Sequence, residues 1–322
     1  MIQIEAREFD NQDSLASYFG SGVTVAHPEV CIAHLSDLHF VTHPKLKRVT
    51  FRGMVGHDLN ALAALETQLT SMHVDLLFVT GDLSTWGDET SLLDARRFIM
   101  VLAGSLNLQP AHVLWIPGNH DVIVDYRKIA TKQRKFTQIC GTTEPLRQLI
   151  VKGMDVAVFS FDSTLRTGLW PFTSNRGEVT QEAFNAFNQA VLKVDAATPA
   201  AIKLVQIHHH PLPIPYKKDD GVSGVLTTMT NGATFADRMQ ETGMNLIMHG
   251  HEHYAYSTSL QPYPQEKPTV LVAAGTACQV KNHEMSFNYV KVRRNKDISL
   301  TRYVYKETGF RVDRNSTKIF RS

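Results

Sequence analysis

Five short motifs rich in aspartate, asparagine and histidine recur along this chain of 322 residues. They are Asp37-Leu38-His39, Gly81-Asp82, Gly118-Asn119-His120-Asp121, His208-His209-His210-Pro211 and Gly250-His251-Glu252-His253. Their carboxylate, carboxamide and imidazole groups bind zinc, iron, manganese, cobalt or nickel, and they include no thiolate of the kind that holds structural zinc. Seven such ligands, one of them from the histidine triplet, are too many for one tetrahedral ion. They suit two ions about 3.5–4 Å apart with a bridging carboxylate.

Each motif ends an apolar segment that has the composition of a buried β-strand. These segments are 30–37, 74–82, 112–121, 201–210 and 245–253, and helical patterns over 58–72 and 92–106 separate the first three. The alternation predicts βαβ units and a central parallel sheet, and ligands of such sheets bind outside the carboxyl ends of the strands. In an extended backbone, the pairs Asp37 with His39 and His251 with His253 each point to one side.

The remaining segments complete a mixed α/β pattern. Residues 125–151 read as mostly helical and 156–163 as a strand, and Thr180 can cap a helix over 181–194. A short helix over 233–243 stops at Gly243, and the segments after Pro268 read as hairpin strands. Because there is no low-complexity linker and no repeat, we expect one domain over 29–322, preceded by an N-terminal extension over 1–28.

The composition is that of an ordinary globular protein, with 43% hydrophobic and 20% charged residues. A formal net charge of +2 provides no basic field for nucleic acid, and no apolar run is long enough to span a membrane. The first residues mix charges from the start, unlike a signal peptide. Cys31, Cys140 and Cys278 are widely spaced, so we expect free thiols and a cytoplasmic location.

Each motif alone also has an ordinary structural explanation. Gly-Asp and Gly-Asn-His-Asp both fit turns, because glycine and asparagine tolerate a left-handed backbone. Five motifs in order, each after an apolar strand, are much harder to explain as separate turns. Histidines outside the motif positions, such as His34 and His249, fit a packing role better than a ligand role.

The series Asp37-x-His39, Gly81-Asp82, Gly118-Asn119-His120-Asp121, His209-x-Pro211 and Gly250-His251-x-His253 resembles the calcineurin-like metallophosphoesterase superfamily. The resemblance extends from about Val30 to Ala274. It implies a four-layer α/β/β/α sandwich in which two mixed β-sheets are flanked by helices. The segments HHHPLP, TNGATFADRM and MHGHEH are similar to the branch that holds class III cyclic-nucleotide phosphodiesterases and glycerophosphodiesterases. Leu212 stands where that branch carries a second proline.

The resemblance assigns roles to individual residues. One metal ion is expected between Asp37, His39, Asp82 and His253. The other is expected between Asp82, Asn119, His209 and His251, so that Asp82 bridges two ions of iron, manganese or zinc. His120 is expected to contact the phosphate and protonate the leaving oxygen, with Asp121 orienting its imidazole.

The histidine triplet offers more than one ligand. In an extended segment His209 points away from His208 and His210, so the three cannot all face one ion. The His-x-Pro pattern of the superfamily, anchored on Pro211, selects His209. We then expect His208 either in the packing of the sheet or in contact with a ligand residue, and His210 toward the loop that follows.

The predicted activity is hydrolysis of a phosphodiester, of the cyclic-nucleotide or glycerophosphodiester type, by a hydroxide that bridges the two ions. The alternatives are a phosphomonoesterase or nucleotide pyrophosphatase, and a non-catalytic metal-bound interaction module, which the complete ligand set disfavours. The expected partner is a small-molecule phosphoester rather than nucleic acid, and the oligomeric state, with a homodimer as one option, is open. Residues 125–151, 168–177 and 211–231 are expected to frame the substrate.

Overall fold

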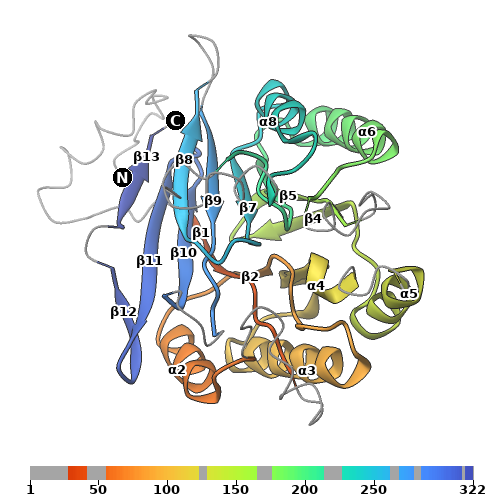
Figure 1. Ribbon diagram of the computed structural model, residues 1–322. Helices are drawn as coiled ribbons and strands as arrows, with labels where there is room; N and C mark the ends of the chain where they lie inside the picture. Colours follow the sequence, from red (N-terminus) through yellow and green to blue (C-terminus); the bar gives the residue numbers. More distant parts are fainter. Residues whose placement is uncertain are drawn as a thin grey trace, which may run out of the picture.

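The computed structural model describes residues 28–41, 56–122, 129–164, 176–213, 227–261, 268–278, 284–313 and 316–321. Within these ranges the backbone forms two β-sheets with helices on their outer sides (Figure 1). None of the helices in these ranges is long and apolar enough to cross a membrane. The expected N-terminal extension lies outside the described residues except for Pro28, as do most of the loops expected to frame the substrate.

The first sheet has seven strands in the described part, in the order β12-β11-β10-β1-β2-β3, with β13 beside β11. Their bounds are β1 Glu29–Leu35, β2 Leu76–Val79, β3 Val113–Trp115, β10 Ser286–Arg293, β11 Ile298–Lys306, β12 Gly309–Val312 and β13 Lys318–Phe320. Strands β1, β2 and β3 run parallel, and β10 lies antiparallel to β1. Helices α2 (Leu59–Thr70) and α3 (Glu89–Ser105) make the connections between the parallel strands, and a short 3₁₀ turn, η3 (Pro110–His112), precedes β3.

The second sheet has six strands in the described part, in the order β4-β5-β6-β7-β9-β8. Their bounds are β4 Leu146–Val151, β5 Met154–Ser160, β6 Ile202–Gln206, β7 Leu246–His249, β8 Tyr256–Leu260 and β9 Thr269–Ala273. The four inner strands are parallel, and β4 and β8 are antiparallel edge strands. Helices α6 (Gln181–Ala197) and α8 (Gly232–Glu241) cover its outer face, while α4 (Asn119–Val122) and α5 (Ile129–Cys140) follow β3.

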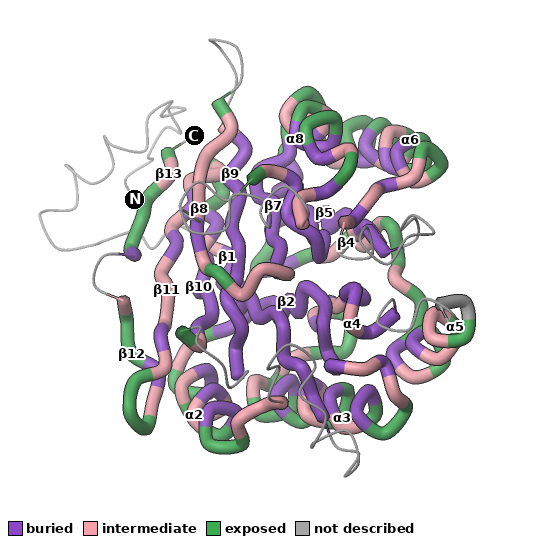
Figure 2. Tube along the Cα trace, in the orientation of Figure 1, coloured by how far each residue is buried: buried purple, intermediate pink, exposed green. Residues whose placement is uncertain are grey.

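Alternation along the strands builds three apolar layers between the four layers of backbone. In β1, Val30 and Ile32 pack between the two sheets, whereas Cys31 and Ala33 pack with α2 and α3. In the second sheet, Leu204 faces the inter-sheet core, and Val205 packs among the aromatic side chains of α6 and α8. Figure 2 shows this buried interior running through both sheets. The predicted α/β/β/α sandwich of two mixed sheets is confirmed.

Local signals in the sequence were partly right. Thr180 caps α6, since its side chain accepts a hydrogen bond from the Ala183 amide at 3.2 Å, and Gly243 follows α8 with φ +65°. The helical prediction for 125–151 is wrong beyond Cys140, because residues 146–151 form β4 and pair with β5. Gly141 (φ +88°) ends α5 in a left-handed conformation, and Pro145 disfavours continuation of a helix. All three cysteines are buried and unpaired.

Candidate metal centre

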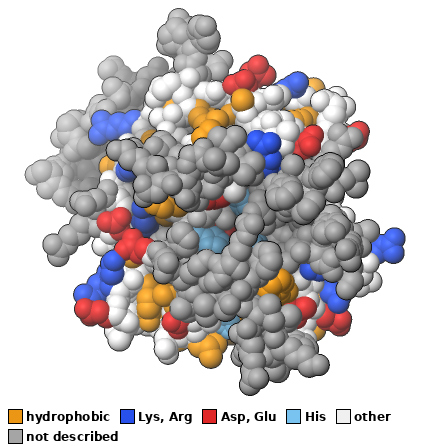
Figure 3. Space-filling model, in the orientation of Figure 1, with side chains coloured by type: hydrophobic (Ala, Val, Ile, Leu, Met, Phe, Trp, Pro, Cys, Tyr) orange, Lys and Arg blue, Asp and Glu red, His pale blue; other side chains and the backbone are white. Residues whose placement is uncertain are grey.

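The five motifs lie just past the ends of five parallel strands, from both sheets. Strands β1, β2 and β3 stop at Leu35, Val79 and Trp115, and β6 and β7 stop at Gln206 and His249. The polar side chains that follow gather into two neighbouring clusters of potential metal ligands, and a further group shares His251 with the second cluster. The first cluster has Asp37, His39, Asp82 and His253, the second has His208, His209 and His251, and the further group has His210, His251 and Glu252. Figure 3 shows histidine surface near the centre of the face that looks onto these strand ends.

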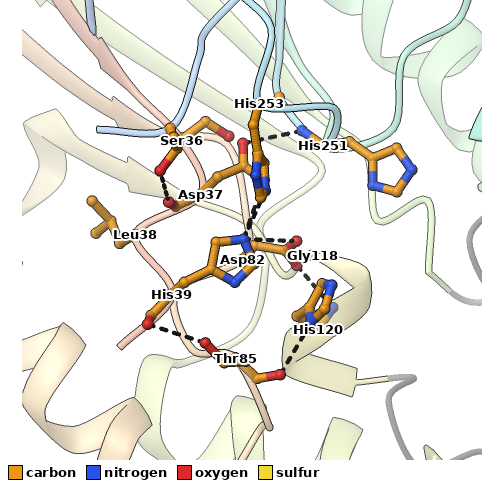
Figure 4. Close-up of polar contacts among 12 residues, drawn as sticks. Ser36, Asp37, Leu38, His39, Asp82, Thr85, Gly118, His120, His251 and His253 are labelled. Atoms are coloured by element: carbon orange, nitrogen blue, oxygen red, sulfur yellow. Dashed lines mark hydrogen bonds and ion pairs between the residues drawn. The ribbon is translucent and has the colours of Figure 1, made fainter. Parts of the chain in front are cut away.

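The first cluster contains the four residues predicted for one ion: Asp37, His39, Asp82 and His253. The two imidazole Nε2 atoms of His39 and His253 lie 2.8 Å apart. Asp37 Oδ1 is 3.3 Å from His253 Nε2, and His39 Nε2 is 3.8 Å from both Asp37 Oδ1 and Asp82 Oδ2. These separations match ligand atoms that share one ion at metal–ligand distances of about 2 Å. Figure 4 shows His39 and His253 converging on Asp82.

The second cluster forms around Asn119. Its Oδ1 lies 2.8 Å from His251 Nδ1 and 2.9 Å from His208 Nε2, and His208 Nε2 is also 3.4 Å from Asp82 Oδ2. One carboxylate oxygen of Asp82 therefore faces both clusters. This arrangement suits the bridging role predicted for Asp82.

His209, the predicted ligand from the triplet, belongs to this cluster, since its ligand atom lies within 4.8 Å of those of His208 and His251. Its Nδ1 is 2.7 Å from Ser163 Oγ, and its ring centre is 4.5 Å from that of His251. Its Nε2 is buried and has no hydrogen-bond partner in the described part of the chain. The residue whose nitrogen reaches Asn119 and Asp82 is instead His208, with Nδ1 2.7 Å from the carbonyl oxygen of Thr80.

The alternation of side chains along β6 indicates which face of the sheet His208 lies on. In β6, Val205 packs with α6 and α8 and Leu204 packs between the sheets. Alternation from Leu204 places position 208 on the inter-sheet side and position 209 on the helix side. Asp82 lies four positions after Phe78, whose side chain packs between the sheets. Alternation therefore places Asp82 on the inter-sheet side as well. The prediction used the distance to Pro211 and not the strand face, so it did not include His208 among the candidate ligands.

The pairs at i and i+2 do not act as extended pairs. Nine described non-glycine residues have positive φ, and five of them are predicted ligands: Asp37, His39, Asp82, His251 and His253. His251 and His253 accordingly point into different clusters. Left-handed conformations of this kind cost about 1–3 kcal/mol each and concentrate at functional sites. The backbone past each strand end is thus held in the conformation that aims the side chains.

His120 lies at the edge of the first cluster. Its ring meets that of His39 edge-on at 4.9 Å, and its Nδ1 is 3.0 Å from the Thr85 carbonyl oxygen. Asp121, predicted to orient His120, makes other contacts: its two oxygens accept from the amides of Leu83, Ser84 and Gly118 and from the Ser84 hydroxyl. Asp121 therefore ties two ligand-bearing loops together, and Thr85 orients His120.

Burial and charge set the protonation of the cluster. Burial, reinforced by neighbouring imidazoles, holds the pKa values of His39, His209 and His251 well below the usual range, so these rings are neutral and able to ligate at neutral pH. Burial alone would raise the pKa of Asp82, but His208 and His120 outweigh it and keep that pKa very low. Burial would lower the pKa of His208, yet the carboxylates of Asp82 and Asp37 raise it to about 9. The second cluster therefore attracts positive charge.

The donor set fits two cations. Asp37 Oδ2 accepts from the His251 amide at 3.1 Å, and Asp82 Oδ1 accepts from the His120 amide at 2.8 Å. The other oxygens, Asp37 Oδ1 and Asp82 Oδ2, are buried with no hydrogen-bond partner in the described ranges. Buried carboxylate oxygens are costly unless a hydrogen bond, a charge or a metal compensates them. Both of these oxygens face the nitrogen atoms of the clusters, which is where cations would compensate them.

Comparisons with known proteins agree with this geometry. A family model described as "Calcineurin-like phosphoesterase" matches residues 31–255. A search of the curated proteins finds no match. The solved structure of purple acid phosphatase PPD1 from yellow lupin is 12% identical with a TM-score of 0.60, covering 89% of this chain and 53% of that one. A putative 5'-nucleotidase from Staphylococcus aureus is 13% identical with a TM-score of 0.47, covering 91% and 54%. The chain spans about half the length of these two proteins. At this identity, the lupin enzyme supports the fold alone.

Proposed function

Because the chain belongs to the calcineurin-like phosphoesterase family, we propose that it uses two transition-metal ions to hydrolyse a small phosphodiester. The observation that carries this proposal is the buried Oδ2 of Asp82, which faces both ligand clusters without a hydrogen-bond partner in the described residues. A single carboxylate oxygen between two sets of imidazoles suits a bridging ligand. The diester preference follows from the similarity of the segments HHHPLP and MHGHEH to the class III phosphodiesterase branch.

The contacts support a definite ligand set. The first ion would be held by Asp37, His39, Asp82 and His253. For the second ion, Asp82, Asn119 and His251 are joined by His208 rather than His209, because His208 Nε2 is the nitrogen within 3.4 Å of both other oxygen ligands. The Thr80 carbonyl on His208 Nδ1 would fix its tautomer and leave Nε2 free to ligate.

Two bound cations would supply a water nucleophile at neutral pH and positive charge for the phosphoryl oxygens. The protein adds His120, whose Nδ1–H donates to the Thr85 carbonyl and so fixes the orientation of the ring. Its Nε2 is then available to donate to the leaving oxygen of the ester. Asp121 holds the loops of Asp82 and Gly118 in register, and so positions His120 and Asn119.

Metal analysis followed by a parallel assay tests the proposal. The purified protein is expected to contain about two transition-metal ions per chain and to hydrolyse bis(4-nitrophenyl) phosphate and either cyclic nucleotides or glycerophosphodiesters. Hydrolysis of monoesters or of nucleotide pyrophosphates alone would replace the diester preference with that alternative. Two bound ions without any hydrolysis would favour a non-catalytic interaction module.

A further inference from the structure

Strand β4 is one edge of the second sheet, and its outer side pairs with no strand in the described part of the chain. Figure 1 shows it at the opposite end of this sheet from β8. An unpaired edge presents backbone N–H and C=O groups that can pair with a further strand, and most proteins protect their edges against this. The direction of these groups and their protection therefore decide whether β4 can accept another strand.

The turn between β4 and β5 indicates which residues of β4 are hydrogen-bonded to β5. Lys152 and Gly153 have φ of +50° and +72°, as the central residues of a two-residue type I′ hairpin do. The residues that flank such a turn, here Val151 and Met154, hydrogen-bond to each other, and they are paired in the register of the two strands. The backbone groups of Val151 therefore point toward β5.

The other end of β4 has the same phase. The Ser160 amide of β5 donates to the carbonyl oxygen of Pro145, just before β4, at 3.1 Å. Hydrogen-bonded pairs alternate with non-bonded pairs along antiparallel strands, so the odd-numbered residues of β4 bond to β5. The N–H and C=O groups of the even-numbered residues Leu146, Gln148 and Ile150 consequently point outward, away from the sheet.

The cations of this edge are directed toward the first sheet and do not protect β4. Arg147 Nη1 donates to the Ala111 carbonyl oxygen, just before β3, at 3.1 Å, and Lys152 Nζ lies 2.9 Å from Asp75 Oδ2. The strand itself has no proline and no bulge, since its register with β5 is continuous. The side chain of Ile150 is 73% exposed. An edge of this kind is open to another strand.

The sequence of β4 is complementary to itself in the reverse direction. In an antiparallel pair of two copies with Gln148 on the two-fold axis, Leu146 lies opposite Ile150 of the second copy, so all outward-pointing residues meet outward-pointing partners. A shift by two residues would place Leu146 or Ile150 beyond the end of the other strand. The same register brings Glu144, whose side chain is 57% exposed, near Lys152 of the second copy, which adds opposite charges at both ends.

From these observations we infer that β4 pairs with β4 of a second copy of this chain, so that the second sheets of two molecules form one continuous sheet. A cavity of about 290 Å³ lined by Gln148, Ile150 and Thr198 lies beside the strand and gives room for the Leu146 side chain of the second copy. Pairing of a single short strand buries a small area, so we expect a weak dimer with a Kd on the order of 10 μM.

Sedimentation velocity of the full-length, metal-containing protein at about 1–200 μM, a range that spans this Kd, tests the pairing. The wild type is expected to change from monomer to dimer as the concentration rises. Gln148 is exposed, so Gln148→Lys and Gln148→Glu should fold normally, which circular dichroism checks. Each variant places two like charges on the two-fold axis and is expected to weaken association at least about tenfold.

An equimolar mixture of Gln148→Lys and Gln148→Glu tests the register. With Gln148 on the axis, the new lysine lies opposite the new glutamate, so the mixture is expected to form a heterodimer at least as stable as the wild-type dimer. Ile319→Lys is the matched control, because it adds the same charge at a 65% exposed position of another edge strand, β13. It is expected to dimerise like the wild type.

A wild type that stays monomeric over the whole concentration range overturns the inference. A dimer that neither Gln148 variant weakens also overturns it, since another surface would then hold the two copies. The same conclusion follows if the mixture fails to associate, or if Ile319→Lys weakens association as much as Gln148→Lys. Phosphoester hydrolysis does not enter this measurement, so the proposed function stands or fails separately.

Discussion

At the scale of single residues, the histidine triplet gives the sharpest test of the metal centre. His208→Ala removes the nitrogen that lies 2.9 Å from Asn119 and 3.4 Å from Asp82, so we expect loss of about one of two metal ions. His209→Ala removes a ring that is hydrogen-bonded to the Ser163 hydroxyl. We expect this variant to retain both ions. Metal content by mass spectrometry of each purified variant decides between them. The reverse pattern would restore the assignment based on the His-x-Pro spacing.

His120 is expected to act on the leaving group and not on the metals. His120→Ala should lower kcat by about 10²–10⁴-fold for esters with an alkoxide leaving group, while the metal content stays near that of the wild type. The loss should be smaller with 4-nitrophenyl esters, because 4-nitrophenolate leaves without needing a proton. An equal loss on both kinds of ester would argue against the role of an acid, and loss of metal would argue for a ligand.

Residue chemistry was more predictable than side-chain direction. The motifs predicted all seven residues that the structure gathers, because ligand types and their place after strands are written in the sequence. Which imidazole of the triplet reaches Asn119 and Asp82 depended on where a side chain points. The sequence pattern assumed an extended backbone, whereas Asp37, His39 and Asp82 have φ values near +50°. Such conformations are stabilised by tertiary contacts that periodicity does not contain.

At the scale of elements, the loops after the strands must pack closely to bring the ligands together. A Cβ atom at Gly81 (φ +93°) would overlap the His208 imidazole and come within 2.9 Å of the Gly118 Cα. Gly81→Ala is therefore expected to destabilise the protein by more than about 2 kcal/mol and to deplete the metal of the second cluster.

Gly243→Ala is the matched control for Gly81→Ala. Gly243 also has positive φ, at +65°, but a Cβ atom there would meet only Lys203 Nζ, at 3.8 Å. The substitution should cost about 1 kcal/mol of backbone strain and leave the metal content unchanged. Urea unfolding and metal analysis of the two variants make the comparison. If both lose metal equally, general destabilisation and not close packing at Gly81 explains the loss.

His34 links the stability of β1 to pH. It is buried, with Nε2 3.0 Å from Thr80 Oγ1 and Nδ1 3.4 Å from Asn288 Nδ2, and burial lowers its pKa to about 3. Because the unfolded chain takes up this proton near pH 6.5 and the folded protein does not, the contribution to stability is complete above pH 6.5 and falls with decreasing pH. The loss is about 2 kcal/mol at pH 5.

His34→Gln isolates this effect, since glutamine does not titrate. Lowering the pH from 8 to 5 should reduce the unfolding free energy of the wild type by about 2 kcal/mol more than that of His34→Gln. Metal ligands and other histidines are common to both proteins and cancel in the difference. A pH-independent difference would mean that His34 is protonated in the folded protein as well.

Which elements exist was predicted better than which elements pair. Apolar runs and helical periodicity predicted β1, α2, β2 and α3, because these are local patterns. The antiparallel pairing of β10 with β1 joins Ser286–Arg293 to the start of the fold, and no local pattern encodes a partner that far along the chain. Residues 146–151 read as helix because their apolar side chains do not alternate cleanly. Hydrogen bonding to β5 decided their structure.

At the scale of the whole molecule, the candidate metal centre lies where the two sheets meet. Asp37, Asp82 and Asn119 follow strands of the first sheet, whereas His208, His251 and His253 follow strands of the second. Each cluster contains ligands from both sets. Two bound ions would therefore link the sheets at one end of the inter-sheet core, and would also neutralise the buried carboxylates of Asp37 and Asp82.

Removal of the metals should consequently destabilise the whole protein and not only stop catalysis. A ligand present at about 100 to 1,000 times its dissociation constant stabilises the folded state by about 3–4 kcal/mol, so chelation should lower the Tm by several degrees. Readdition of zinc, manganese or iron should reverse the change. Calorimetry with and without chelator measures it, at a pH above 7 where His39 and His251 are neutral.

Variants of the bridging carboxylate separate this linkage from general effects of the chelator. In Asp82→Asn the bridging oxygen loses its charge, so both ions should bind weakly and the chelator should shift the Tm much less than in the wild type. Ala196→Phe, at an exposed position of α6 that is not among the candidate ligands, should show the full wild-type shift. An equal shift in Asp82→Asn and Ala196→Phe would mean that the ions do not bind through Asp82.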